Sequence, residues 1–161
     1  ELNALSNLGI LYRNLGQIER AVRFFKKCYK LAAELSERAT EANALGNLGV
    51  SYAILGDSEK ALEYHQKSFA IFNELGDIRR ASNKLNDIGL LLIEMRSFDE
   101  AISYFLIHLS VARQYGERRA EAAVIGNIGK VYAALGDYPR SIELSEEHLR
   151  IAVEIEDLRS E

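Results

Sequence analysis

The sequence is poor in residues that interrupt or cross-link a chain, with one proline and one cysteine among 161 residues. Because a single cysteine cannot form an internal disulfide, Cys28 suits a reducing compartment, and we expect a cytoplasmic protein. No uncharged apolar run reaches the roughly 18 residues of a membrane-spanning helix, and no secretion signal opens the sequence. These absences predict a protein that does not insert into a membrane.

Charge and motifs restrict the function further. The 20 basic and 24 acidic residues give a net charge of -4, which disfavours nucleic acid as a partner. The sequence contains no nucleophile elbow, phosphate loop or zinc-protease motif. We therefore expect no enzyme, no cofactor and no metal site.

The main feature of the sequence is a repeat with a step of 40 residues, marked by four triplets: Asn7-Leu8-Gly9, Asn47-Leu48-Gly49, Asp87-Ile88-Gly89 and Asn127-Ile128-Gly129. A fixed period of this size predicts stacked repeats rather than one closed core. The chain is then a single array over 1–161, with copies at about 1–37, 38–77, 78–117 and 118–157. Because residue 1 falls inside a copy, we expect a longer repeat region around this sequence.

Each copy is predicted to form two helices. In the second copy, Leu45, Leu48 and Tyr52 are spaced three and four apart and share a helical face. Gly56 then ends the helix and Asp57 can cap the next one. The prediction is an all-α fold of eight antiparallel helices, near 1–15, 17–35, 38–55, 58–75, 78–95, 98–115, 118–135 and 138–155.

Two features depart from simple helical repeats. The third copy has Arg96 in place of the turn glycine, and we expect the capping-box match from Ser97 to Glu100 to hold that turn. Glycines also recur inside the first helices, at Gly9, Gly49, Gly89 and Gly129, where each costs about 1 kcal/mol relative to alanine. We interpret them as points where the two helices of a copy pass too close for a larger residue.

The order Leu8-Gly9, Tyr12, Ala21 and Phe25 resembles the tetratricopeptide repeat, whose usual unit is about 34 residues. Gly46-Asn47-Leu48-Gly49 and the run from Ala61 to His65 are similar to the long repeats of the Pins/LGN class of polarity adaptors. The resemblance implies a right-handed α-solenoid of four helix-turn-helix units. It also implies that the first helix of each unit lines a concave groove.

Six asparagines and one aspartate lie in register along the first helices. They are four residues apart in each of three copies, as Asn3 and Asn7, Asn43 and Asn47, and Asn83 and Asp87, and the fourth copy has Asn127. In related repeat proteins these positions face the groove and touch bound peptide. An amide offers both a donor and an acceptor to a peptide backbone.

Neighbouring residues extend this predicted site. We find no packing role for Gly46 and Gly126, which suggests close approach of a ligand backbone, and Asn86 fills the same column. Arg13 and Lys130 could attract an acidic side chain, or could be simple solvated charges. The predicted peptide-binding residues are Asn3, Asn7, Arg13, Asn43, Gly46, Asn47, Asn83, Asn86, Asp87, Gly126, Asn127 and Lys130.

An alternative stays open for the amides: they bond to one another or to water and hold the curvature of the solenoid. The predicted function is a non-catalytic adaptor that binds an extended segment of a partner protein. The alternatives are a sensory or autoinhibitory segment of a larger signalling protein, or a structural spacer.

Other polar residues carry weaker signals. His108 and His148 are equivalent, in a column that Cys28 and Ser68 fill elsewhere, so packing is favoured over a metal pair. His65 is expected to be exposed. Residues 17–35 are mainly basic and residues 137–157 mainly acidic, which indicates solvated faces or a weak head-to-tail self-association.

Overall fold

The fold is all-α, as the repeat pattern predicted. The computed structural model describes residues 1–160, with side chains as far as Glu156, and no strand occurs in that range. Its helices are α1 (Leu2–Asn14), α2 (Ile18–Glu34), α3 (Arg38–Ile54), α4 (Ser58–Glu74), α5 (Ile78–Glu94), α6 (Phe98–Gln114), α7 (Arg118–Ala134) and α8 (Tyr138–Ser160). Seven of these helices match the predicted ranges closely, whereas α8 extends beyond the predicted end near 155.

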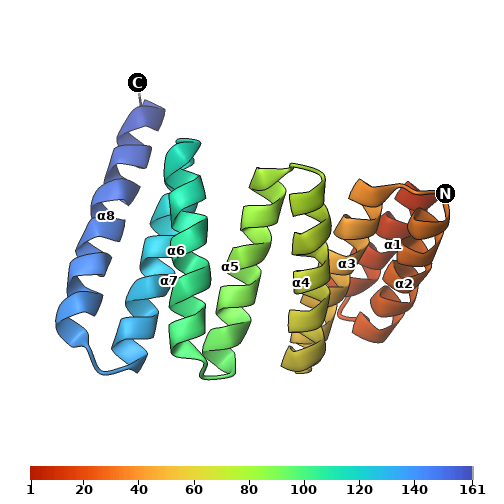
Figure 1. The fold of residues 1–161 in the computed structure, drawn as a ribbon, viewed down its shortest axis with the longest axis horizontal. Coiled ribbons are helices and arrows are strands. Elements are labelled where there is room, and N and C mark those ends of the chain that lie inside the picture. The colour runs from red at the N-terminus through yellow and green to blue at the C-terminus, as the bar shows by residue number, and fades with distance from the viewer. Residues whose placement is uncertain (161) are drawn as a thin grey trace. The chain divides into compact units, whose positions relative to one another are not determined.

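Contacts divide the chain into two compact units, with the boundary between Lys84 and Leu85, inside α5. In the first unit, α1, α2, α3 and α4 pack against one another in chain order. In the second, α7 packs between α6 and α8. Figure 1 shows that consecutive helices within each unit run antiparallel, as the short turns require.

The turns between helices use a left-handed residue, which glycine adopts without a steric penalty. Gly56 has φ +77°, and Asp57 then accepts a hydrogen bond from the Lys60 backbone N–H at 3.1 Å. Arg96 takes the same conformation, with φ 61°, in the turn between α5 and α6. The capping-box prediction for this turn was wrong, because the Ser97 side chain makes no capping bond. Backbone bonds hold the turn instead, from Arg96 N to Ile93 O and from Ser97 N to Leu92 O.

Three of the four glycines inside the first helices, Gly9, Gly49 and Gly89, face a ring on the second helix of the same repeat. A Cβ added to Gly9 would lie 2.5 Å from the Phe25 ring, and one added to Gly49 would lie 2.6 Å from the His65 ring. The predicted close approach is thus confirmed at Gly9, Gly49 and Gly89, where its cause is a ring packed against the backbone. At Gly129 the prediction was wrong, because an added Cβ would meet only ordinary contacts, the nearest at 3.4 Å from Leu144 Cβ. His65 is only 2% exposed, so the expectation that it would be exposed was wrong.

Burial is distributed along the array rather than collected in one centre. In the first unit, one cluster joins Ala21, Val22, Phe25 and Leu48, and another joins Ala42, Leu45, Ile71, Phe72 and Ala81. Cys28 is buried as expected, and burial raises the pKa of its thiol. In the described residues no helix has the length and apolar character that crossing a membrane requires.

Candidate functional site

A hollow of about 130 Å³ opens between three helices of the first unit. Most of its lining residues come from α3, while α4 and the first half of α5 supply the remainder. Its lining residues are Ala42, Asn43, Gly46, Asn47, Val50, Ser68, Phe72 and Lys84. Three of the predicted peptide-binding residues therefore lie together around one hollow.

Hydrogen bonding orients the amide at this site. Arg13 on α1 donates from Nη1 to Oδ1 of Asn47 at 3.1 Å, while its guanidinium lies over the Phe25 ring. The Nδ2 of Asn47 is left as a donor, and Asn43 on the preceding turn is exposed. At the lining of the hollow, the Ser68 hydroxyl on α4 donates a hydrogen bond to the Ala42 carbonyl on α3 at 2.7 Å.

The two glycines beside the amides differ in their surroundings. A Cβ on Gly46 would meet Ser68 Oγ at 3.4 Å and Lys84 Nζ at 3.5 Å, which is ordinary contact. A Cβ on Gly126 would lie 3.0 Å from Nδ1 of His148. The prediction that neither glycine has a packing role was therefore wrong for Gly126, because the His148 ring on α8 occupies that space.

In the second unit the amides bond to one another. Asn127 is 8% exposed and donates from Nδ2 to Oδ1 of Asn86 at 3.0 Å. Lys130 donates to the Asn127 Oδ1 at 3.3 Å. Asp87 is half-buried on the same helix as Asn86. This is the arrangement that the alternative interpretation of the amides described, and it joins α5 to α7.

The remaining predicted residues lie further out. Asn3 and Asn7 are exposed on α1, and Asn83 is exposed on α5.

Sequence reasoning missed Lys84, which contributes the ammonium group to the hollow. The signal was present, because the equivalent positions in the other repeats are Ala4, Ala44 and Val124. A cation in an otherwise apolar column marks a position where packing does not decide the residue.

The histidines form no metal site within the described residues. His108 is buried, and neither of its ring nitrogens has a hydrogen-bond partner. Burial lowers its pKa, and the nearby Glu117 and Asp87 carboxylates offset this in part. His148, on α8, is exposed although it packs against Gly126.

Comparison with known proteins settles the family. The model of the tetratricopeptide repeat family matches residues 1–74 and 80–152 of this chain. The chain belongs to the tetratricopeptide repeat family. A search of curated proteins found no significant match to this sequence.

Solved structures with the same fold are distant in sequence. BtubC (BKLC) from P. vanneervenii superimposes with a TM-score of 0.88 at 22% identity, over 96% of this chain and 64% of that protein. Aspartyl phosphate phosphatase F from Bacillus subtilis superimposes with a TM-score of 0.89 at 15% identity, over 97% of this chain and 41% of that protein. A signal transduction ATPase with a tetratricopeptide repeat sensor, from Pyrococcus horikoshii, superimposes with a TM-score of 0.89 at 23% identity. The match covers 99% of this chain and 25% of that protein.

The chain thus spans less than two thirds of the length of each of these proteins. At these identities the likeness establishes the α-solenoid fold of helix-turn-helix repeats. The fold is typical of protein–protein interaction scaffolds, and no catalytic family matches the chain.

Proposed function

We propose that this tetratricopeptide repeat protein is a non-catalytic scaffold that binds an extended peptide of a partner at the hollow between α3, α4 and α5. The observation that carries the proposal is the grouping of Asn43, Asn47 and Lys84 around one opening. The amides suit the backbone of an extended peptide, and the ammonium suits an acidic side chain of that peptide.

The two units enter this proposal differently. In the first unit, Asn43 is exposed and the Asn47 Nδ2 remains available to a ligand. In the second unit, bonds to Asn86 and Lys130 already use both the Nδ2 and the Oδ1 of Asn127, which is the residue equivalent to Asn47. Peptide contact is therefore proposed for the first unit, and a structural role is proposed for Asn86 and Asn127.

The test starts from a displayed library of random peptides, selected on the purified protein. The tightest peptide is then measured by calorimetry against Asn43→Ala, Lys84→Ala and the matched control Asn73→Ala, an exposed amide on α4. Because each hydrogen bond contributes about 0.5–1.5 kcal/mol, the first two changes should each weaken binding several-fold. Equal affinities for all three variants would reject the hollow as the binding site.

The second candidate is a sensory or autoinhibitory role within a larger signalling protein. It is favoured by the likeness to an ATPase with a tetratricopeptide repeat sensor and to an aspartyl phosphate phosphatase, both far longer than this chain. Its ligand would be an effector domain of the same protein. A signalling role in the cytoplasm and membership of the Pins/LGN class also stay predictions.

Weak head-to-tail self-association remains a further proposal for the partner of this chain. Residues 17–35 are mainly basic and residues 137–157 are mainly acidic, so the attraction would be between opposite charges and should weaken as salt is added. Light scattering across a range of protein concentrations tests this proposal, and a constant monomer mass up to millimolar concentration would refute it.

A further inference from the structure

Two cations and a pair of stacked rings lie together on α1 and α2. The Tyr12 and Phe24 rings are stacked with centroids 5.2 Å apart and an interplanar angle of 11°. Arg20 covers Tyr12 at 5.7 Å, and Lys27 covers Phe24 at 5.8 Å. Cation–π contact thus holds both cations in place without any carboxylate.

The second repeat contains the same stack with one difference. Tyr52 and Tyr64 stack at 5.3 Å, at positions 40 residues further along the chain. Lys60 lies over the Tyr52 ring, and Lys67 lies over the Tyr64 ring. There each lysine also has a carboxylate partner, because Asp57 pairs with Lys60 and Glu63 pairs with Lys67.

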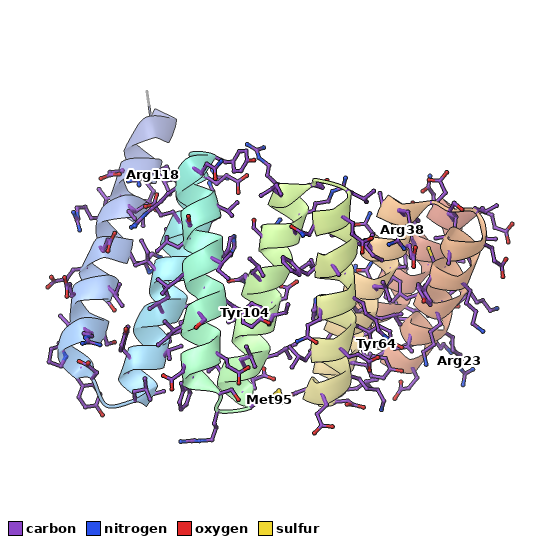
Figure 2. The ribbon with its side chains drawn as sticks, viewed as in Figure 1. Arg23, Arg38, Tyr64, Met95, Tyr104 and Arg118 are labelled. Atoms are coloured by element: carbon purple, nitrogen blue, oxygen red, sulfur yellow. The ribbon has the colours of Figure 1, made fainter. Side chains whose placement is uncertain are left out.

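The first repeat lacks both carboxylates. The positions equivalent to Asp57 and Glu63 are Gln17 and Arg23. Gln17 accepts a hydrogen bond from Arg20 at 2.7 Å and brings no charge. Arg23 adds a cation where the second repeat has an anion, and Figure 2 shows it pointing away from the ribbon beside α2.

These cations surround a hollow of about 500 Å³, lined by Tyr12, Arg20, Arg23, Phe24, Lys26 and Lys27. That volume lies within the range of about 300–1,000 Å³ that is usual for ligand sites. The lining contains no carboxylate. Glu19 lines an adjoining hollow with Arg20 and Arg23, yet it forms no ion pair with either among the described side chains. Hydrogen bonding to the Tyr52 side chain raises the pKa of Lys26, so that ammonium stays charged.

We propose that this basic hollow is a second interaction site, which binds a carboxylate-rich segment of a partner protein. The partner's Asp or Glu side chains would take the places that Asp57 and Glu63 fill in the second repeat. Arginine suits this role because its guanidinium can hold a carboxylate by two parallel hydrogen bonds. The site shares no residue with the hollow at Asn43 and Asn47.

The rings argue against single-stranded nucleic acid as the ligand. Such ligands bind by stacking bases on open aromatic faces. Here Tyr12 and Phe24 are stacked on each other. Arg20 also lies over the Tyr12 ring and Lys27 over the Phe24 ring. Each ring therefore already contacts another ring and a cation, an arrangement that favours positioning of cations over stacking of a base.

The experiment uses a fluorescein-labelled hexa-glutamate peptide, with anisotropy measured at low and high salt. Arg23→Glu should weaken binding at least about tenfold, a loss of roughly 1.4 kcal/mol. The matched control Arg119→Glu makes the same change in total charge at an exposed position of α7 and should leave affinity within about twofold. Asn43→Ala, at the other hollow, should also leave this affinity unchanged.

A gain-of-function variant completes the test. The double change Asp57→Gln with Glu63→Arg removes both carboxylates that pair with Lys60 and Lys67 and copies the residues of the first repeat, so a second peptide should bind per protein molecule. Four outcomes would overturn the proposal: no binding of hexa-glutamate, equal losses in Arg23→Glu and Arg119→Glu, loss of binding in Asn43→Ala, or tighter binding of oligo-deoxythymidine with the same dependence on Arg23.

Discussion

Arg13 on α1 and Asn47 on α3 are joined by a 3.1 Å hydrogen bond between Nη1 and Oδ1. This bond links the first helices of two successive repeats and fixes which edge of the Asn47 amide faces the hollow. Orientation of a polar group before a ligand arrives reduces the entropy lost on binding. The Arg13–Asn47 pair is therefore expected to matter for both stability and affinity.

Removal of Arg13 tests this pair. Arg13→Ala should lower the free energy of unfolding by about 1–2 kcal/mol, because a charge-assisted hydrogen bond and a contact with Phe25 are lost together. Peptide affinity should fall in the same variant. Urea unfolding measures the first effect, with Arg119→Ala as an exposed control. An unfolding free energy equal to that of the control would show that the bond contributes nothing.

Gly46 offers a test in which peptide binding should weaken without a loss of stability. Gly46→Ala meets only ordinary contacts, so it should leave stability unchanged or raise it by up to about 1 kcal/mol through helix propensity. It also narrows the hollow and should weaken peptide binding.

Gly49→Ala is the matched control, three residues further along the same helix. Its added Cβ would lie 2.6 Å from the His65 ring, so this variant should be clearly less stable than the wild type. Thermal unfolding compares the two. Equal destabilisation by both changes would mean that Gly46 is a packing glycine and has no role in the site.

Much of the fold could be predicted because the same helical pattern occurs four times in the sequence, once in each repeat. Spacing alone located the helices, and Gly56 and Asp57 marked a turn and a cap that the structure contains. Arg96 was harder, because backbone hydrogen bonds hold that turn and leave no mark in the sequence. The extension of α8 to Ser160 was likewise unmarked.

The candidate site was less predictable, because it depends on contacts between side chains of different repeats. The Asn86–Asn127 bond and the position of Lys84 both require knowing how α5 lies beside its neighbours within each unit. His65 was misjudged because it was read alone. Its column contains Phe25 and Phe105, which pack on Gly9 and Gly89 as His65 packs on Gly49.

Glu121, in the second unit, should make the stability of the fold depend on pH. Glu121 accepts from Arg113 Nε at 2.8 Å and from Arg118 Nη1 at 2.6 Å, and Arg118 also pairs with Glu154. Burial alone would raise the pKa of Glu121, but the bonds from the two arginines outweigh it, and the pKa lies below the usual value of 4.5. A lowered pKa stabilises the fold above that usual value, and the stabilisation is lost as pH falls through the folded pKa.

Glu121→Gln should therefore be less stable than the wild type by about 1–2 kcal/mol at pH 7, a figure reduced because both arginines are half exposed. Near pH 3 the two proteins should approach each other, because the wild-type carboxyl gains a proton. Glu100→Gln, an exposed change on α6, is the control. A stability difference that stays constant from pH 7 to pH 3 would contradict the assigned ion pairs.

His108 should add a second pH dependence of stability, at a higher pH than that of Glu121. Burial lowers its pKa below the usual 6.5, with Glu117 and Asp87 acting in the opposite direction. A lowered pKa means that the fold favours the neutral ring. The stabilisation is full above pH 6.5 and declines as pH falls from there towards the folded pKa. His108→Cys copies the residue at Cys28 and should lose less stability between pH 8 and pH 5.5 than the wild type. Identical losses would show that His108 does not titrate differently on unfolding.

The most direct test of the central proposal is to map a selected peptide onto the protein by NMR chemical-shift perturbation. We expect the largest shifts at the side-chain amides of Asn43 and Asn47 and at the backbone amides around Gly46 and Lys84. The Asn86 and Asn127 side chains should shift little, because each is already bonded to the other. Largest shifts on the outer faces of α2 and α4, with the Asn43 and Asn47 signals unmoved, would contradict the proposal.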